Sequence, residues 1–271
     1  AFYLYYGVIL HEGISNISPT EVWAGYAAVF HGGDTIYDST GNAESIVNQG
    51  VTSAATNGIV AGVMTKASSG TVGLQYSNPV TSKALTSISE VSVSGWFKKT
   101  GSKTTVLASN KNSWDLNGFM AIDENETYFS VAVNQKHQGP ADKGTLTKNT
   151  WEHLAFSYSQ TNLESYHNGA QIYTNNNAVP LSDIAETYWA FGSYTKKSAD
   201  SYAGGMDELR VYNGAVSADW VKAEYDSIVN VSTFIEFQEV ITLVSNFPNI
   251  ETPTISSNND GTITVTAQIT D

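Results

Sequence analysis

Two acidic segments far apart in the chain carry side chains suited to bind a cation. The turn IYDSTGN contains Asp38 and Asn42, and the later segment GGMDELRVYNGAVS contains Asp207. A tight turn with Asp38 and Asn42 can present a carboxylate, an amide oxygen and main-chain carbonyls together, and calcium prefers several oxygen ligands. The same two side chains commonly hydrogen-bond to the backbone of their own turn. Both interpretations stay open on local sequence.

A second group of side chains has the chemistry of sugar recognition. Trp114 lies in NKNSWDLNG without alternating apolar neighbours that would bury it. Sugar sites combine an aromatic face, which stacks on a pyranose ring, with amide and acid hydrogen bonds from loops. The candidate ligand-binding residues, taken from this segment and from the loop Val133 to Gly144, are Trp114, Asn112, Asp115, Gln135 and His137. The alternative is a half-buried tryptophan that anchors its loop.

Catalytic patterns are weaker than these binding patterns. A retaining glycosidase needs two carboxylates facing one cleft, and the chain has no Glu-x-Asp-x-Glu segment that would place them on one strand face. IDENE, which contains Asp123, indicates an exposed turn, and the adjacent acids of MDELR point to opposite faces. The five histidines lack metal-ligand spacing, and His153 is expected to be structural. We therefore expect a protein that is not an enzyme.

Charge and composition narrow the partners. Acidic residues number 26 against 13 Lys and Arg, for a formal net charge of −13. A polyphosphate backbone would be repelled, so nucleic acid is not expected as a partner. No uninterrupted apolar run is long enough to span a bilayer, so membrane insertion is not expected either. The chain has no cysteines, which excludes disulfides and thiolate metal sites.

Short strands must position these side chains. EVSVSGWFK, from Glu90 to Lys98, alternates strictly, with Val91, Val93 and Phe97 on one face. Lys98 and Lys99 are expected to end this strand in solvent. The same alternation, bounded by turn residues, recurs in TTVLAS, GFMAID, YFSVAV, WEHLAFSYS, LESYHNGAQIY, YWAFGSY and GMDELRVY. The sequence predicts an all-β protein built as a two-sheet antiparallel sandwich.

Three local signals complete the predicted elements. Asn168 and Gly169 stand between two strand-like runs, which predicts a tight hairpin. SADWVKAEYDSI, from Ser217 to Ile228, predicts a short helix capped by its serine. The end of the chain, TPTISSNNDGTITVTAQITD, predicts a strand pair that starts like an immunoglobulin-like or fibronectin-like domain but is too short to complete one.

Several of these segments, in this order, resemble a known family. VWAGYAAVFH…DSTGN, VSVSGWFK, WEHLAFSYS…LESYHNGAQIY and GGMDELRVYNGAVSADWVKAEY are similar to the LamG-like, concanavalin A-like lectin domain of bacterial surface proteins. The resemblance covers Val22 to Ile228 and implies a jelly-roll sandwich. The opening AFYLYYG…VWAGYAAVFH further looks like the tail of a DUF2341 module. The predicted domains are 1–21 (terminal strand and linker of that module), 22–228 (jelly roll) and 229–271 (linker and start of an Ig-like β domain or assembly segment).

The resemblance also implies a metal site. Members of this family often hold calcium at the edge of the sandwich, between the acidic turn and the last long strand. Carried over to this chain, the implied calcium ligands are Asp38, Gly41, Asn42 and Asp207. A jelly roll pairs its first and last strands, which would place Asp207 against the turn of Asp38.

Two functions are consistent with these features. We expect a calcium-supported, lectin-like binding or adhesion module of an exported bacterial surface protein, extracellular or on the cell surface, whose partner is a glycan or a surface or matrix protein. The alternative is a structural subunit of an extracellular filament or adhesin stalk. AFYLYYGV and TITVTAQIT have no evident partner in the chain, and an open strand edge is a template for self-association.

Overall fold

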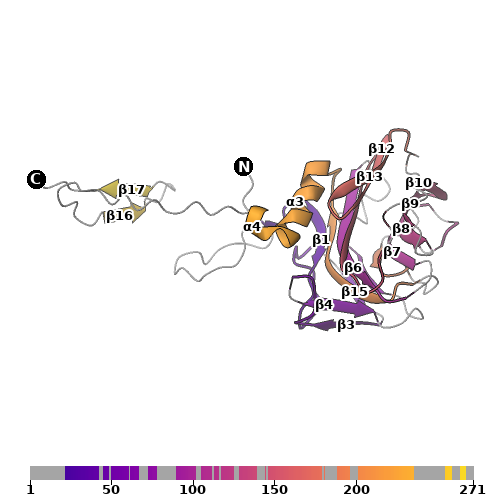
Figure 1. Ribbon diagram of the computed structural model, residues 1–271, viewed down its shortest axis with the longest axis horizontal. Helices are drawn as coiled ribbons and strands as arrows, with labels where there is room; N and C mark the ends of the chain where they lie inside the picture. Colours follow the sequence, from indigo (N-terminus) through magenta and orange to yellow (C-terminus); the bar gives the residue numbers. More distant parts are fainter. Residues whose placement is uncertain are drawn as a thin grey trace, which may run out of the picture. The chain divides into compact units, whose positions relative to one another are not determined.

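The computed structural model divides the chain into two compact units, Ala1–Phe234 and Ile235–Asp271. The residues described are 22–42, 45–48, 50–60, 62–66, 73–77, 90–101, 105–111, 113–115, 117–124, 128–138, 144, 146–178, 180, 188–195, 201–234, 254–257 and 263–266. The expected strand AFYLYYGV and the rest of the DUF2341-like segment, 1–21, lie outside them. Within the first unit, two antiparallel sheets face each other (Figure 1).

Sheet A is the larger of the two layers. Its strands are β1 (Tyr26–Phe30), β3 (Val51–Ala54), β4 (Val63–Lys66), β6 (Glu90–Lys99), β11 (Glu152–Ser159), β12 (Asn162–His167), β13 (Ala170–Asn175) and β15 (Gly204–Tyr212). They follow the order β13-β12-β11-β6-β15-β4-β3, and β1 also pairs with β15. The first and last long strands of the sandwich are therefore neighbours, as the jelly-roll topology requires.

Sheet B forms the opposite layer. Its strands are β2 (Ser45–Asn48), β5 (Leu74–Ser77), β7 (Thr105–Ser109), β8 (Phe119–Glu124), β9 (Tyr128–Val133), β10 (Lys136–Gln138) and β14 (Tyr188–Phe191). The order is β10-β9-β8-β7-β14-β5-β2. The all-β, two-sheet prediction is confirmed.

The core lies between the sheets, where the predicted alternation of β6 is confirmed. Val91, Val93 and Phe97 point into a continuous apolar cluster, which Phe119 and Trp189 join from sheet B. The other face of β6 is also buried: Trp96 is only 3% exposed. Both faces of β6 are therefore covered, although only one of them is apolar.

The expectation of solvent at Lys99 and Asp123 is wrong. Both side chains are fully buried and form an ion pair that joins β6 to β8, and therefore sheet A to sheet B. The reason is strand parity: Lys99 continues the inward-facing positions that include Phe97, and Asp123 continues those of Phe119 and Ala121. Each charge is tolerated in the core because the other neutralises it.

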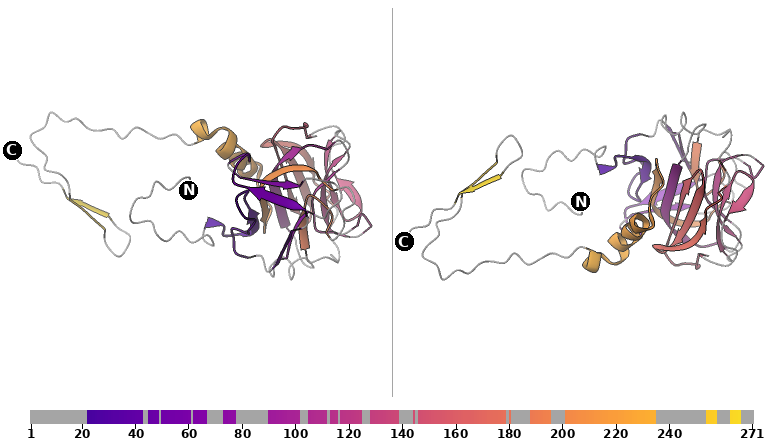
Figure 2. Two further views of the ribbon diagram at one scale, coloured as in Figure 1. Left: turned by 90° about the horizontal axis from the view of Figure 1, so that it is seen from below. Right: turned by 90° about the horizontal axis from the view of Figure 1, so that it is seen from above.

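The predicted hairpin and helix are both present. Asn168 and Gly169 connect β12 to β13 with positive φ values of 50° and 74°, as the tight turn requires. Helix α3 (Ala218–Val229) begins after Ser217, whose hydroxyl accepts a hydrogen bond from the Trp220 N–H, and a short α4 (Val231–Phe234) follows. Helix α3 covers the outer face of sheet A (Figure 2), where Val221 packs on β11 and β12.

The second unit contains one antiparallel strand pair, β16 (Thr254–Ser257) and β17 (Ile263–Thr266). This confirms the strand pair that TPTISSNNDGTITVTAQITD predicts. It also corrects the expectation that TITVTAQIT lacks a partner, because β17 pairs with β16. Among the described residues, no helix has the length and apolar character needed to cross a membrane.

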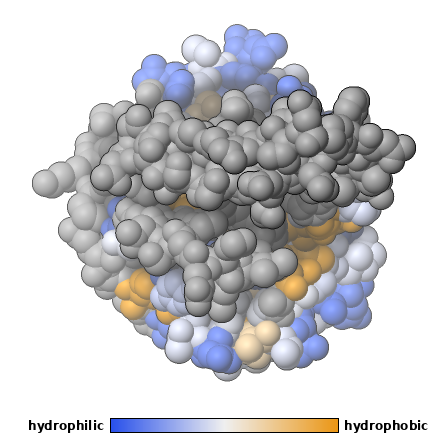
Figure 3. Space-filling model, turned by 90° about the vertical axis from the view of Figure 1, so that its left-hand side faces the viewer, coloured by the Kyte–Doolittle hydropathy of each residue, from blue (hydrophilic) through white to orange (hydrophobic). Residues whose placement is uncertain are grey.

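Some large apolar side chains reach the surface of the described chain. On the face shown in Figure 3, hydrophobic residues stand as separate patches between polar ones. Scattered single side chains of this kind are normal for a protein surface. The exposed large hydrophobic residues of the described chain are Val22, Tyr37, Ile46, Val60, Val229 and Val231.

Candidate functional site

The predicted calcium turn is closed by its own hydrogen bonds. Asp38 Oδ1 accepts from the N–H groups of Val29 (2.9 Å) and Thr40 (3.1 Å). Asp38 Oδ2 accepts from the Thr40 hydroxyl (2.6 Å) and from the Asn42 N–H (3.0 Å). Gly41, at a φ of 71°, donates its N–H to the Asp38 carbonyl (3.2 Å). The turn therefore follows the second interpretation, in which the Asp carboxylate binds the backbone.

Asp207, within β15 at the irregularity in its pairing with β6, is held in the same way. Its Oδ1 accepts from the N–H groups of Gly32 and Glu208, both at 2.9 Å. Its Oδ2 accepts from the N–H groups of Ile59 (3.1 Å) and Val60 (3.4 Å), which lie between β3 and β4. Burial raises the pKa of Asp207, and these hydrogen bonds partly offset that rise. The carboxylate joins three chain segments.

Strand β1 lies between the two acids. Phe30 bridges to Asp38 on one edge of β1 and pairs with Leu209 of β15 on the other. All four carboxylate oxygens of Asp38 and Asp207 meet N–H or O–H donors, and such dipoles repel a cation. No group of three or more acidic or histidine side chains that could hold a metal occurs in the described part of the chain. This arrangement does not fit a calcium ion shared by the two acids, so calcium stays a prediction.

Three of the five predicted sugar-binding residues, Trp114, Asp115 and Gln135, lie near one another. Trp114 and Asp115 lie between β7 and β8, and Gln135 lies in the turn between β9 and β10. Gln135 Nε2 donates to the Asp115 carbonyl at 2.6 Å. Trp114 is half-buried and packs against an apolar cluster on the outer face of sheet B, which includes Met120 and Ala132. Asn112 lies outside the described residues, and His137 is described only as a backbone position of β10.

Lys111 holds this loop in place. Its side chain is fully buried, and its Nζ donates to the carbonyls of Trp114 (3.3 Å) and Asn134 (2.5 Å). The same ammonium lies 4.7 Å from the centroid of the Trp114 ring, a cation–π contact. Burial lowers the pKa of Lys111 to about 8, against the opposing charge of Asp115. Lys111, Trp114, Asp115, Asn134 and Gln135 are called the rim site below.

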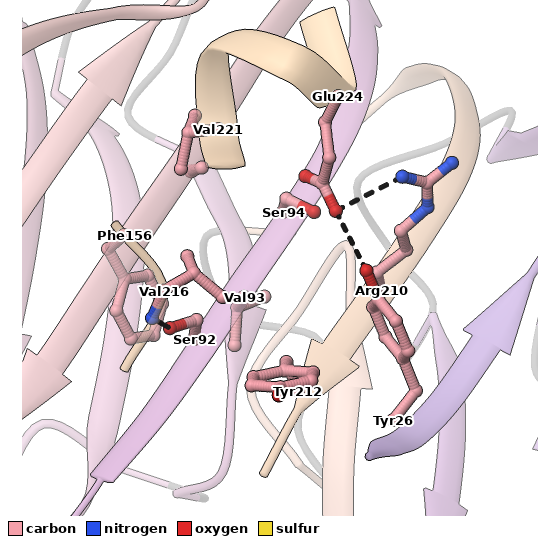
Figure 4. A pocket seen from close by; sticks show the side chains of 11 residues that line it. Tyr26, Ser92, Val93, Ser94, Phe156, Arg210, Tyr212, Val216, Val221 and Glu224 are labelled. Atoms are coloured by element: carbon pink, nitrogen blue, oxygen red, sulfur yellow. Dashed lines mark hydrogen bonds and ion pairs between the residues drawn. The ribbon is translucent and has the colours of Figure 1, made fainter. Parts of the chain in front are cut away.

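A different polar cluster lies under α3. Arg210 donates from Nη2 to Glu208 Oε2 (2.7 Å) and pairs through Nη1 with Glu224 Oε1 (3.1 Å). The Tyr26 hydroxyl donates to Glu224 Oε1 (3.2 Å), as Figure 4 shows, and His31 Nδ1 lies 2.5 Å from Glu208 Oε1. These five residues, called the α3 ion cluster, tie β1 and β15 to the helix.

The charges of the α3 ion cluster stabilise one another. Burial alone would raise the pKa of Glu208, but the His31 hydrogen bond and the Arg210 charge lower it to about 2. Burial also acts to raise the pKa of Glu224, and Arg210 outweighs it, so that this pKa is lowered too. His153 lies beside the cluster, with Nε2 3.8 Å from Glu224 Oε2, and burial lowers its pKa to about 4.

The cavity beneath α3 is too small for a sugar. It is lined by Tyr26, Ser94, Arg210 and Glu224 among others, and has room for about one water molecule (Figure 4). The acid that lines it, Glu224, and the neighbouring Glu208 of the cluster are both engaged by Arg210. This neighbouring carboxylate pair therefore holds the helix and does not face an open cleft.

Sequence reasoning missed Lys111 and the α3 ion cluster. Glu208 and Arg210 are two residues apart on one strand and so share a face. Glu224 follows Val221 by three residues, which places it on the packed face of the helix. Those two spacings could have indicated the cluster. For Lys111, the sequence offers only a lysine three residues before Trp114, which does not distinguish a buried cation from an exposed one.

Comparison with known protein families identifies the family of this chain. The description "Concanavalin A-like lectin/glucanases superfamily" matches residues 68–222, more than half of the chain. This defines the class as a jelly-roll domain of the lectin and glucanase type. The chain belongs to the concanavalin A-like lectin/glucanase superfamily, in its laminin G-like branch, as the sequence resemblance predicted. A search of curated proteins found no match.

Solved structures with a similar fold include receptor-binding domains of botulinum neurotoxins. The domain of the C/D mosaic serotype is 13% identical with a TM-score of 0.58, covering 75% of this chain and 51% of that chain. The serotype D binding domain is 12% identical with a TM-score of 0.58 (78% and 53%). A DC binding domain solved in complex with rat synaptotagmin II is 14% identical with a TM-score of 0.56 (75% and 52%). This chain spans about half the length of these proteins, and at such identity the likeness concerns the fold alone.

Proposed function

We propose that this protein is a non-catalytic, lectin-like binding module that recognises a glycan through the rim site. The single observation that carries the proposal is the convergence of Trp114, Asp115 and Gln135 from two separate loops. An aromatic ring beside an exposed carboxylate and an amide is the combination that sugars require. Lys111 pre-organises that combination, which lowers the entropy that binding would otherwise cost.

The proposal that the module is not an enzyme is supported by the state of its acids. Glycoside hydrolysis needs two carboxylates, one of them protonated, facing a cleft. Glu208 and Glu224 are close together, but both have lowered pKa values and are engaged by Arg210. Asp123 is used by Lys99 in the core. Glu208 and Glu224 therefore lack the protonated state of a general acid, and Asp123 lacks the position of one.

Glycan binding by matched variants tests this function. Trp114→Ala is expected to weaken binding of an array-positive glycan by about tenfold or more, which corresponds to about 1.4 kcal/mol. Tyr37→Ala removes an exposed aromatic outside the rim site and is the matched control, with affinity expected to stay within about twofold. Equal affinity of Trp114→Ala and the unaltered protein, or a glycan array without any binding, would reject the proposal.

Calcium support of the module is a separate part of the proposal. If calcium binds at the turn of Asp38, the cation must replace hydrogen bonds now donated by Thr40 and Asn42. A ligand that binds only the folded state stabilises it by mass action, so millimolar calcium should raise the melting temperature by several degrees and EDTA should lower it. Asp38→Asn should abolish the calcium response. An unchanged melting temperature under both treatments retires the calcium prediction and leaves glycan binding untouched.

The proposal also includes a location and a partner. The protein is an exported bacterial protein, extracellular or on the cell surface, and its partner is a glycan or a surface or matrix protein. The filament alternative is favoured by one observation: β16 and β17 pair only with each other among the described residues, so each has an outer edge open to another strand. Light scattering across a concentration series distinguishes the two, because a filament subunit must show mass growth and a binding module must not.

A further inference from the structure

The polar atoms of the rim site fall into two groups, those already used and those left for a ligand. The donors of Lys111, Asn134 and Gln135 are used. Gln135 Nε2 binds the Asp115 carbonyl, and Asn134 donates its N–H to the Gly118 carbonyl (2.7 Å) and its Nδ2 to the Pro180 carbonyl (3.1 Å). The Lys111 ammonium donates hydrogen bonds to two carbonyls and also lies against the face of the Trp114 ring. These donors hold the two loops together.

The groups left over are acceptors. The carboxylate of Asp115 is exposed, and within the described chain it makes no hydrogen bond or ion pair. Gln135 is exposed as well, and with Nε2 engaged, its Oε1 is the amide atom that remains. A carboxylate and an amide oxygen offer several lone pairs and no proton at neutral pH. A ligand that fits them must bring the hydrogen-bond donors itself.

Neither of the two described lysines in these loops offers its positive charge to a ligand on the outer face. Lys111 is fully buried beneath the ring. Lys136 is exposed, but it pairs with Val133, whose side chain points into the core between the sheets. Paired residues share a face of the sheet, so Lys136 lies on the face opposite Trp114, which packs against the outer-face cluster that includes Ala132. An anionic sugar at the ring would meet Asp115 and the net charge of −13, while the Lys111 ammonium is buried and already bound to two carbonyls and the described Lys136 lies on the other face.

We infer that the rim site selects sugars that donate hydrogen bonds, namely neutral hexoses and amino sugars, and discriminates against uronic and sialic acids. The inference rests on the proposed function and assigns its ligand class. Two neighbouring hydroxyls of a pyranose can donate to the two oxygens of Asp115 in a bidentate pair, and hydrogen bonds to a carboxylate are stronger than neutral ones. An ammonium group at the same position adds charge attraction. A sugar carboxylate there would add like-charge repulsion.

The test uses three probes displayed at equal density on the same scaffold: galactose, glucosamine and glucuronate. We expect the galactose or glucosamine probe to bind at least about fivefold more tightly than the glucuronate probe, with both affinities reduced in Trp114→Ala. Asp115→Asn keeps the shape of the side chain and replaces an acceptor with a donor. Asp115→Asn should weaken binding of the preferred probe about threefold to tenfold and reduce the ratio of its affinity to that of glucuronate. Tyr37→Ala should change neither the affinity nor the ratio.

The outcomes separate the two claims. If glucuronate binds as tightly as the other probes or more tightly, and Trp114→Ala still removes binding, the ligand class is overturned and the rim site stands. If binding survives in Trp114→Ala, or if no probe binds, both claims are overturned. An unchanged preference in Asp115→Asn overturns the role of the free acceptors, provided that thermal unfolding shows the variant to be folded.

Discussion

The α3 ion cluster and the rim site contain similar chemical groups but have different roles. In each, a buried cation faces a tryptophan: Arg210 lies 5.6 Å from the ring centroid of Trp23, and Lys111 lies 4.7 Å from that of Trp114. Arg210 forms ion pairs with two buried carboxylates, those of Glu208 and Glu224, so its positive charge is neutralised. Lys111 binds carbonyls, and the nearby carboxylate of Asp115 stays in solvent. Charges that neutralise one another hold elements together, whereas acceptors left over at a surface are available for a ligand.

The largest effect should come from removing the shared cation of the α3 ion cluster. Arg210→Met leaves Glu208 and Glu224 buried without their common partner and should lower the free energy of unfolding by about 3 to 5 kcal/mol. Urea unfolding measures the loss. Lys222→Met is the control, because its pair with Asp226 is exposed and is worth well under about 1 kcal/mol. Similar losses in the two variants would show that the cluster does not hold the helix.

Lowering the pH should reduce the free energy of unfolding in two steps, through His153 and Glu208 in and beside the α3 ion cluster. His153 has its folded pKa lowered to about 4 from 6.5, so the unfolded state binds the extra proton and stability falls as pH drops from 6.5 towards 4. Glu208 has its folded pKa lowered to about 2 from 4.5, so its contribution is present above pH 4.5 and is lost as pH falls towards 2. Each step amounts to about 3 kcal/mol at most.

Urea unfolding between pH 7 and pH 3 checks both steps. His153→Gln should flatten the upper step and leave the lower one, and Glu208→Gln should do the reverse. The raised pKa of Asp207 works in the opposite direction, since protonation of that group is easier in the folded state, and it reduces the slope at low pH. A stability that does not change between pH 6.5 and 4 would contradict the assignment of a neutral buried His153.

Two glycines separate backbone strain from packing against α3. Gly169 and Gly41 have almost equal positive φ values, 74° and 71°. A Cβ at Gly169 would lie 2.8 Å from the Tyr225 Cβ of α3, whereas a Cβ at Gly41 meets nothing within 4 Å. Gly41→Ala should therefore cost about 1 kcal/mol of left-handed strain, and Gly169→Ala about 2 to 3 kcal/mol. Equal losses in thermal unfolding would mean that α3 yields freely at this turn.

Sequence patterns predicted the sandwich well because alternation and turn chemistry are local. EVSVSGWFK, the Asn168–Gly169 hairpin and the Ser217-capped helix each follow from spacing within a few residues, and each is present. The same local reasoning placed Lys99 and Asp123 in solvent. It failed there because each charge is buried only by virtue of the other, which lies on the opposite sheet.

The candidate site was predicted in part for the same reason. Residue type pointed to Trp114, Asp115 and Gln135, and the structure joins them, but the buried ammonium beneath the ring depends on the approach of Asn134 from another hairpin. For the calcium turn, residue type alone could not decide between cation and backbone as the partner of Asp38. The approach of Val29 from β1, nine residues away, supplies one of the donors that close the turn.

The smallest effect concerns the ring itself. Because burial lowers the pKa of Lys111 to about 8, raising the pH from 7 to 9 should remove the charge that faces Trp114. The indole fluorescence that belongs to Trp114, obtained as the difference between the unaltered protein and Trp114→Phe, should change with a midpoint near pH 8. Lys111→Met should abolish this titration, and Lys136→Met, on the other face of the sheet, should leave it intact. A difference spectrum that titrates only near pH 10 would show that Lys111 is solvated and that the rim site is looser than its hydrogen bonds indicate.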